Sequence, residues 1–172
     1  MQSGDLPYPD TGVLATHFLT VRGVARSRSF YADVLGGQVV LAENPCVVQL
    51  ANSWIIMNPG GGPTPDKPDV TLVPPGDTST VSSFLNLRVA DIQTCYKDWS
   101  ARGAEFLTPP IDRKAELRCY MRDPDGSSSR WARPPGCGTA SSPTLPPAQE
   151  TRACSRPGTR PLNRESYSEA KR

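Results

Sequence analysis

The sequence predicts an α+β fold in which a βαβββ module occurs twice along the chain. Residues 13–58 contain a strand-like run, a helical run and three more strand-like runs, in that order. Residues 82–126 repeat part of this pattern, and a segment rich in Pro and Gly at residues 59–81 separates the two. The 172 residues are enough for one domain with a substantial core.

The first module begins with a strand and a helix. Strand-forming residues dominate positions 13–22 and alternate between two faces. In residues 24–35 the apolar positions recur at helical spacing, and Gly36 follows as a typical end of a helix. Three short strands are then predicted at residues 38–42, 46–51 and 53–58.

The second module is predicted from an internal repeat. Residues 84–88 restate residues 18–22 at an offset of 66, and residues 96–98 restate residues 31–33 at an offset of 65. Its predicted elements are a helix at residues 92–101 and strands at residues 104–107 and 118–121. Because neither module can cover its own sheet, we expect the two to share a core.

The end of the second module does not follow the pattern. In the turn Asp123-Pro124-Asp125-Gly126, Pro presets φ and Gly accepts a positive φ, so an antiparallel strand should follow. The next residues, Ser127-Ser128-Ser129-Arg130, do not resemble a strand. The sequence therefore predicts that the last strand of this module is missing or degraded and that the folded domain spans residues 13–126.

Both ends of the chain are predicted to lie outside this domain. Residues 1–12 are polar and are predicted to form a flexible arm. Residues 127–172 contain seven Pro and eight Ser but no Ile, Val, Phe or Met. Such a segment cannot bury enough apolar area to offset its chain entropy, which predicts a disordered tail. The alternative is a Pro- and Arg-rich recruitment arm for an acidic partner.

Composition and charge exclude several classes of function. Of the 19 Lys and Arg residues, 8 lie beyond residue 126, as do only 3 of the 17 Asp and Glu residues. The domain itself is thus net acidic, which argues against a nucleic-acid partner. No segment approaches the ~20 apolar residues of a membrane span, and the first residues lack an export-signal pattern, so we expect a cytoplasmic protein. Five Cys without a CxxC pair indicate reduced thiols.

Three motifs resemble those of the vicinal oxygen chelate superfamily. They are residues 17–21 (HFLTV), 29–37 (SFYADVLGG) and 118–126 (RCYMRDPDG). This superfamily includes glyoxalase I, extradiol dioxygenases and the bleomycin and fosfomycin resistance proteins. The resemblance implies that the paired modules form a half-open, barrel-like sheet around a cavity that takes a small molecule, and that the protein is a homodimer.

The resemblance also implies a divalent metal, Fe, Mn, Ni or Zn, which polarises vicinal oxygens of a substrate in a lyase or dioxygenase reaction. His17 matches the first metal ligand. The other ligand positions fall at or near Ser83, at Met57 or Asn58, and at Arg130, none of which is a carboxylate or imidazole. The residues expected to line the cavity are Leu19, Met57, Asn58, Ser83, Leu85, Cys119 and Met121.

The sequence leaves three hypotheses about the function. In the first, the chain is a metal-dependent enzyme with His17 as a ligand. In the second, it is a metal-free protein that sequesters a small molecule, and in the third, it is an inactive product. In the second and third hypotheses His17 is simply a hydrogen-bonded residue of the cavity. The missing ligands favour these two hypotheses over the enzyme.

A one-nucleotide deletion is one explanation of the unusual C-terminal sequence. Residues 127–137 can be encoded by a series of permitted codons that begins with TCC. Inserting one A after the first T of this series shifts the reading frame. The shifted codons encode Tyr-Leu-Ile-Glu-Val-Gly-Gln-Ala-Thr-Gly-Leu. That sequence begins with the last strand that the superfamily leads us to expect, including its Glu. A naturally divergent tail is the alternative.

Overall fold

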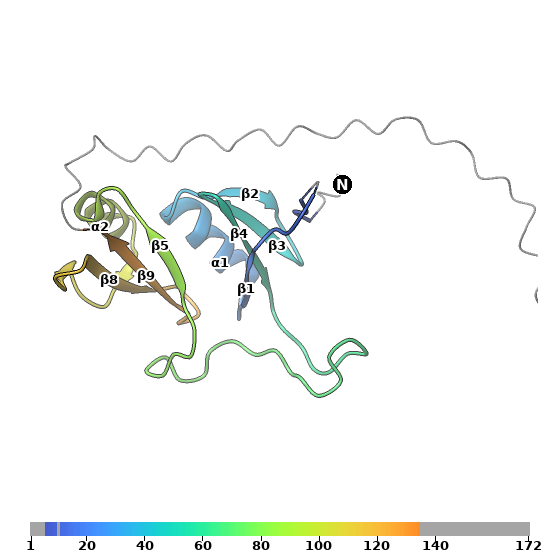
Figure 1. The fold of residues 1–172 in the computed structure, drawn as a ribbon. Coiled ribbons are helices and arrows are strands. Elements are labelled where there is room, and N and C mark those ends of the chain that lie inside the picture. Colours follow the sequence, from blue (N-terminus) through green and yellow to red (C-terminus); the bar gives the residue numbers. More distant parts are fainter. Residues whose placement is uncertain (1–5, 10, 135–172) are drawn as a thin grey trace, which may run out of the picture.

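The first module forms a four-stranded sheet with one helical segment against it. In the computed structural model, which describes residues 6–9 and 11–134, its elements are β1 (His17–Thr20), α1 (Val24–Ser29), η1 (Phe30–Val34), β2 (Gln38–Leu41), β3 (Cys46–Leu50) and β4 (Ser53–Asn58). The strand order is β1-β4-β3-β2, and β1 runs parallel to β4 while the other pairs are antiparallel. Figure 1 shows this sheet beside that of the second module.

The second module has the same topology. Its elements are β5 (Leu85–Arg88), α2 (Ile92–Ala101), β6 (Glu105–Phe106), β7 (Ile111–Asp112), β8 (Leu117–Arg122) and β9 (Ser128–Arg133). The strand order is β5-β9-β8-β6, with β7 also paired to β8, and β5 runs parallel to β9. Strand β9 thus takes the place that β4 has in the first module. The predicted α+β fold of two βαβββ modules is confirmed.

Strand β9 shows that one expectation was wrong. The last strand of the second module is neither missing nor degraded, because residues 128–133 pair with β5 on one side and β8 on the other. The side chain of Trp131 is buried and packs against Trp99, with ring centroids 4.3 Å apart. Its indole Nε1 donates to Ser129 Oγ at 2.9 Å, so a buried polar pair is satisfied.

The second module therefore ends at Arg133 and not at Gly126. Backbone pairing with two neighbours needs no particular side chain, and one large apolar residue is enough to anchor the inward face of β9. The remainder of the predicted tail, residues 135–172, lies outside the described residues, as do residues 1–5 and 10 of the predicted arm.

The predicted helix at residues 24–35 is present as two consecutive segments, α1 and η1. In η1 the hydrogen bonds widen to a π-helical pattern, as Leu35 N donates to Phe30 O at 3.2 Å. The segment ends at Val34, and Gly36 follows shortly after it with a φ of 79°, in the left-handed region that favours glycine. Helix α2 begins at a capping residue, since Asp91 accepts from the backbone N–H groups of Gln93 and Thr94.

One hydrophobic core joins the two modules. Its most deeply buried members come from both sheets and from the helical segments that pack on them: Val21, Leu35, Cys46, Val48, Ile55, Met57, Ile92, Cys119 and Met121. Because each module contributes only part of this cluster, burial of the apolar faces depends on both being folded.

The turn between β8 and β9 fastens the second module to the first. The carboxylate of Asp125 is buried and accepts hydrogen bonds from Arg22 N at 2.8 Å, Arg26 Nη2 at 2.7 Å and Ser27 Oγ at 2.6 Å. The hydroxyl of Tyr31 donates to Asp123 Oδ2 at 3.0 Å. Helix α1 therefore lies between its own sheet and this turn (Figure 1).

A long linker connects β4 to β5 along one end of both sheets (Figure 1). It has little secondary structure, although Gly61 and Leu72 form an isolated bridge. None of the helices within residues 6–9 and 11–134 has the length and apolar character needed to span a bilayer.

Candidate functional site

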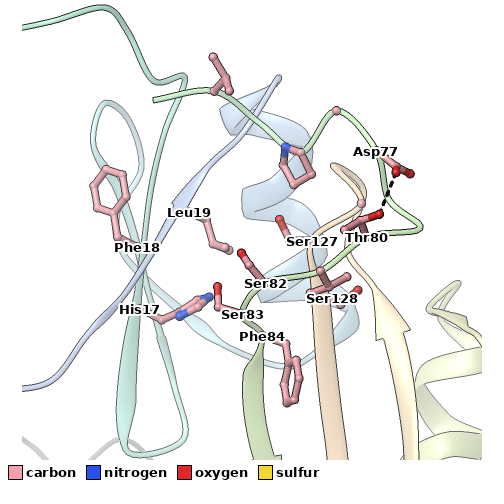
Figure 2. A pocket seen from close by; sticks show the side chains of 15 residues that line it. His17, Phe18, Leu19, Asp77, Thr80, Ser82, Ser83, Phe84, Ser127 and Ser128 are labelled. Atoms are coloured by element: carbon pink, nitrogen blue, oxygen red, sulfur yellow. Dashed lines mark hydrogen bonds between the residues drawn. The ribbon is translucent and has the colours of Figure 1, made fainter. Parts of the chain in front are cut away.

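A pocket of about 330 Å³ opens between the modules, where the linker passes over β1 and the start of β5. Its walls come from β1, from the linker, from the residues before β5 and from the turn that joins β8 to β9 (Figure 2). The lining residues are His17, Phe18, Leu19, Val73, Pro75, Gly76, Asp77, Thr80, Val81, Ser82, Ser83, Phe84, Gly126, Ser127 and Ser128.

Hydroxyl groups dominate the polar part of the pocket. Ser82 and Ser83 precede β5, while Ser127 and Ser128 lead from the turn into β9, so two segments far apart in sequence face one another here (Figure 2). Figure 2 also shows the imidazole of His17 directed toward Ser83. Because a hydroxyl both donates and accepts, this arrangement can hydrogen-bond many kinds of polar group.

The imidazole of His17 is uncharged at neutral pH. Burial lowers its pKa below the ordinary value of 6.5, because a charged ring would lose hydration in the pocket. A neutral ring offers one N–H donor and one nitrogen acceptor. His17 is the one histidine of the sequence, so general acid-base chemistry by imidazole would have to use this residue.

The carboxylate of Asp77 is part of the pocket wall but stabilises its own loop. It accepts from Ser79 N at 2.8 Å, Ser79 Oγ at 2.6 Å and Thr80 Oγ1 at 3.0 Å. These hydrogen bonds, that from the Ser79 hydroxyl first, lower the pKa of Asp77 and keep it ionised. Both oxygens are thus used within the linker.

The predicted site residues divide between the pocket and the core. His17, Leu19 and Ser83 line the pocket. Met57, Cys119 and Met121 lie in the shared core with at most 1% exposure, and Leu85 packs against the same cluster. The side-chain oxygen of Asn58 accepts from Gly60 N at 2.8 Å, which supports the start of the linker.

The strand faces do not explain this division, because the register pairs His17 with Ile55 and Leu19 with Met57, and residues paired across a sheet point to the same side. Leu19 accordingly lines the pocket and also belongs to the core cluster. What distinguishes the pocket is its linker wall, which sequence periodicity does not describe. Its one visible signal is the cluster of hydroxyl residues at positions 78–83, Thr-Ser-Thr-Val-Ser-Ser.

The residues present do not fit a divalent metal. Within the described part of the chain, no group of three or more His, Cys, Asp and Glu side chains is placed to hold an ion. Near His17 the oxygen groups are serine hydroxyls, which are weak ligands when neutral. At the position where the resemblance implies a carboxylate, Arg130 forms an ion pair with Glu116 and contacts Asn86.

The buried thiols are not suited to nucleophilic chemistry. Burial raises the pKa of Cys95 and of Cys119 to about 11, so both remain protonated at neutral pH. Cys46 is buried as well, with its pKa raised by desolvation. All three behave as small core residues.

The model of the "Glyoxalase/Bleomycin resistance protein/Dioxygenase superfamily" matches residues 13–128. No curated protein matches the chain. Many solved structures match the chain. An integron cassette protein from the mobile metagenome of V. Cholerae has a TM-score of 0.55 at 20% identity, with 73% of this chain and 98% of that chain covered.

Two further structures of the same fold are similar to the chain. TnmS3, an antibiotic binding protein from Streptomyces sp. CB03234, has a TM-score of 0.51 at 18% identity, with 74% of this chain and 99% of that chain covered. A fosfomycin resistance protein from Listeria monocytogenes has a TM-score of 0.52 at 12% identity, covering 72% and 93%. At these identities the likeness concerns the fold.

Proposed function

Because the chain belongs to the Glyoxalase/Bleomycin resistance protein/Dioxygenase superfamily, we propose that it binds a small organic molecule in the pocket between its modules without a metal ion. The observation that carries this proposal is the lining of the pocket. Hydroxyl groups and one neutral imidazole stand beside Phe18, Leu19 and Phe84, and the metal-ligand set is incomplete. Such a surface suits a partly apolar molecule held by hydrogen bonds.

The size of the pocket and the comparisons support this function. A volume of about 330 Å³ is at the lower end of the range of small-molecule sites. One structure of the same fold belongs to an antibiotic binding protein and another to a fosfomycin resistance protein. Sequestration of a small molecule requires only binding, so it does not need the missing ligands.

A thermal-shift screen against a fragment library tests the proposal. Wild-type protein is compared with Ser83→Trp, which fills the pocket, and with Ser100→Trp, which adds the same side chain at an exposed position of α2. We expect fragments that raise the melting temperature of the wild type and of Ser100→Trp to lose their effect on Ser83→Trp. Fragments that stabilise all three proteins equally, or no stabilising fragment, would contradict the proposal.

Metal analysis of the purified protein tests the proposal that binding requires no metal ion. We expect less than one-tenth of an equivalent of Fe, Mn, Ni or Zn, and no loss of fragment binding after dialysis against EDTA. A stoichiometric metal that is lost in His17→Ala would instead support the metal-dependent enzyme.

We further propose that the protein is a homodimer. Both edge strands of the first sheet leave apolar side chains in solvent, with Phe18 46%, Val39 40% and Val40 41% exposed. Apolar residues at sheet edges favour pairing with another chain. Light scattering after size-exclusion chromatography should give twice the chain mass for the wild type and the monomer mass for Val39→Lys. A monomeric wild type would contradict the dimer.

A further inference from the structure

Arginine side chains gather on the face of the second sheet that points away from the core. Cys119, Met121 and Trp131 face the core, so alternate residues of the same strands face the other way. The strand register places Arg88 and Arg118 on either side of Ala132, and Arg130 between Asn86 and Tyr120 in the next row. We call Arg88, Arg118 and Arg130 the arginine cluster.

The arginine cluster surrounds one carboxylate. Glu116 contacts Arg88 Nη1 at 3.5 Å, Arg118 Nη1 at 3.6 Å and the guanidinium of Arg130. Three positive groups and one negative group leave a surplus of two positive charges. Each guanidinium has five N–H donors, so a single carboxylate cannot satisfy the cluster.

The free donors are accessible at one side of the cluster. The side chains of Glu116 and Arg130 are only 12% and 16% exposed, whereas those of Arg118 and Arg88 are 32% and 53% exposed. An anion can therefore reach Arg88 and Arg118 without displacing Glu116. At a partly buried position its attraction to the guanidinium groups is screened less than at an open surface.

An aromatic pair links the arginine cluster to the pocket. The rings of Phe84 and Tyr120 meet edge to face with centroids 5.7 Å apart, and Tyr120 pairs with Arg130 across the sheet. Phe84, 43% exposed, also lines the pocket together with Ser128 (Figure 2). One surface thus combines hydroxyl groups, aromatic rings and guanidinium groups.

We propose that the ligand of this protein is an aromatic carboxylate whose ring lies at the rim of the pocket against Phe84 and Tyr120 and whose carboxylate binds Arg88 and Arg118. This inference rests on the proposed small-molecule binding in the pocket and names the chemical class of the ligand. The planar guanidinium matches the two oxygens of a carboxylate, and the exposed face of Phe84 matches an aromatic ring.

The test compares 2-naphthoate with 2-naphthalenemethanol by isothermal titration calorimetry. The two probes share the ring system and differ in the anionic group. We expect naphthoate to bind at least tenfold more tightly, a difference that should shrink as NaCl is raised. Arg118→Gln and Arg88→Gln should each remove most of this difference, whereas Lys97→Gln, which removes one charge from an exposed site on α2, should retain it.

A variant of opposite sign sharpens the test. Glu116→Gln removes the competing carboxylate, so we expect tighter binding of naphthoate and unchanged binding of the alcohol. Far-ultraviolet circular dichroism and the melting temperature establish that each variant is folded. Because the side chain of Arg88 is about half exposed, Arg88→Gln is the substitution that should disturb folding least.

Several results would overturn the inference. They are equal affinities for the two probes, a difference that survives both arginine substitutions, and displacement of naphthoate by inorganic phosphate at equal concentration, which would mark a general anion site. If one of these results is found but neutral fragments bind the wild type and not Ser83→Trp, the proposed function stands and only this inference fails. If neither the two probes nor any neutral fragment binds the wild type, both fail.

Discussion

Asp125 is the side chain on which the contact between the modules depends most. Its carboxylate is fully buried and is satisfied by a backbone N–H, a guanidinium and a hydroxyl, all from the first module. Its neighbour Asp123 accepts from Tyr31 and from backbone groups of the turn itself. The motif Asp-Pro-Asp-Gly, which looks like an ordinary turn in the sequence, thus supplies the two carboxylates that accept hydrogen bonds from the first module.

We expect Asp125→Ala to lower the free energy of unfolding by about 3 kcal/mol. The substitution leaves the buried hydroxyl of Ser27 and the partly buried backbone N–H of Arg22 without their acceptor. Urea denaturation followed by circular dichroism measures the change. Asp98→Ala on the exposed side of α2 is the control, with an expected change within about 0.5 kcal/mol; an equal loss in both variants would disprove the special role of Asp125.

The Tyr31 hydroxyl should make the protein sensitive to alkaline pH. Burial, followed by the nearby charge of Asp123, raises the pKa of Tyr31 well above its ordinary value of 10.0. The unfolded chain therefore loses this proton at a lower pH than the folded protein, so the stabilisation is complete below pH 10 and is lost as pH rises through the folded pKa.

Tyr31→Phe tests this dependence. The variant should be less stable at pH 7, because Asp123 loses a hydrogen bond, but its stability should fall less steeply above pH 10 than that of the wild type. Melting temperatures between pH 7 and pH 11 give both slopes. Parallel slopes would show that Tyr31 does not titrate differently in the folded and unfolded states.

At the scale of the elements, prediction from sequence succeeded where punctuation and periodicity agreed. Strand β4 and helix α2 have the predicted bounds, 53–58 and 92–101, because apolar residues recur at the right spacing and Gly103 follows the end of the helix. Strand β9 was missed because Trp131 is its one large apolar residue. The pocket was only partly predicted, since its linker wall has no periodicity.

The central position of β9 predicts the effect of truncation. A chain that ends at Gly126 lacks the strand between β5 and β8, so both lose their neighbour and Trp99 loses its contact with Trp131. We expect this chain to be unfolded or aggregated. A chain that ends at Pro134 keeps every described contact of the sheet and should melt within a few degrees of the full chain. Differential scanning fluorimetry compares the three; a folded chain 1–126 would contradict the placement of β9.

At the scale of the whole molecule, the two modules form one unit. They share a hydrophobic core, the buried Asp125 joins them, and Arg22 donates to the carbonyl of Pro75 in the linker. Interactions of this kind couple the folding of one half to that of the other. The pocket is positioned by both halves, so it should exist only in the assembled protein.

Calorimetry should accordingly show one unfolding transition, with the calorimetric and van't Hoff enthalpies equal. Residues 13–58 and 82–134, produced separately, should each lack a cooperative transition, because neither can bury its apolar face alone. Two resolved transitions in the intact chain, or cooperative melting of either fragment, would show that the modules are independent.

Most of the residues that line the pocket lie between β4 and β5 and not in the sheets. Loops of this kind accept changes of sequence and length at little cost to stability, whereas the paired strands and their shared core do not. Substitutions in residues 73–83 can therefore change the preferred ligand during evolution while the strands and the core stay the same. The same separation makes this segment the natural target for engineering a new specificity.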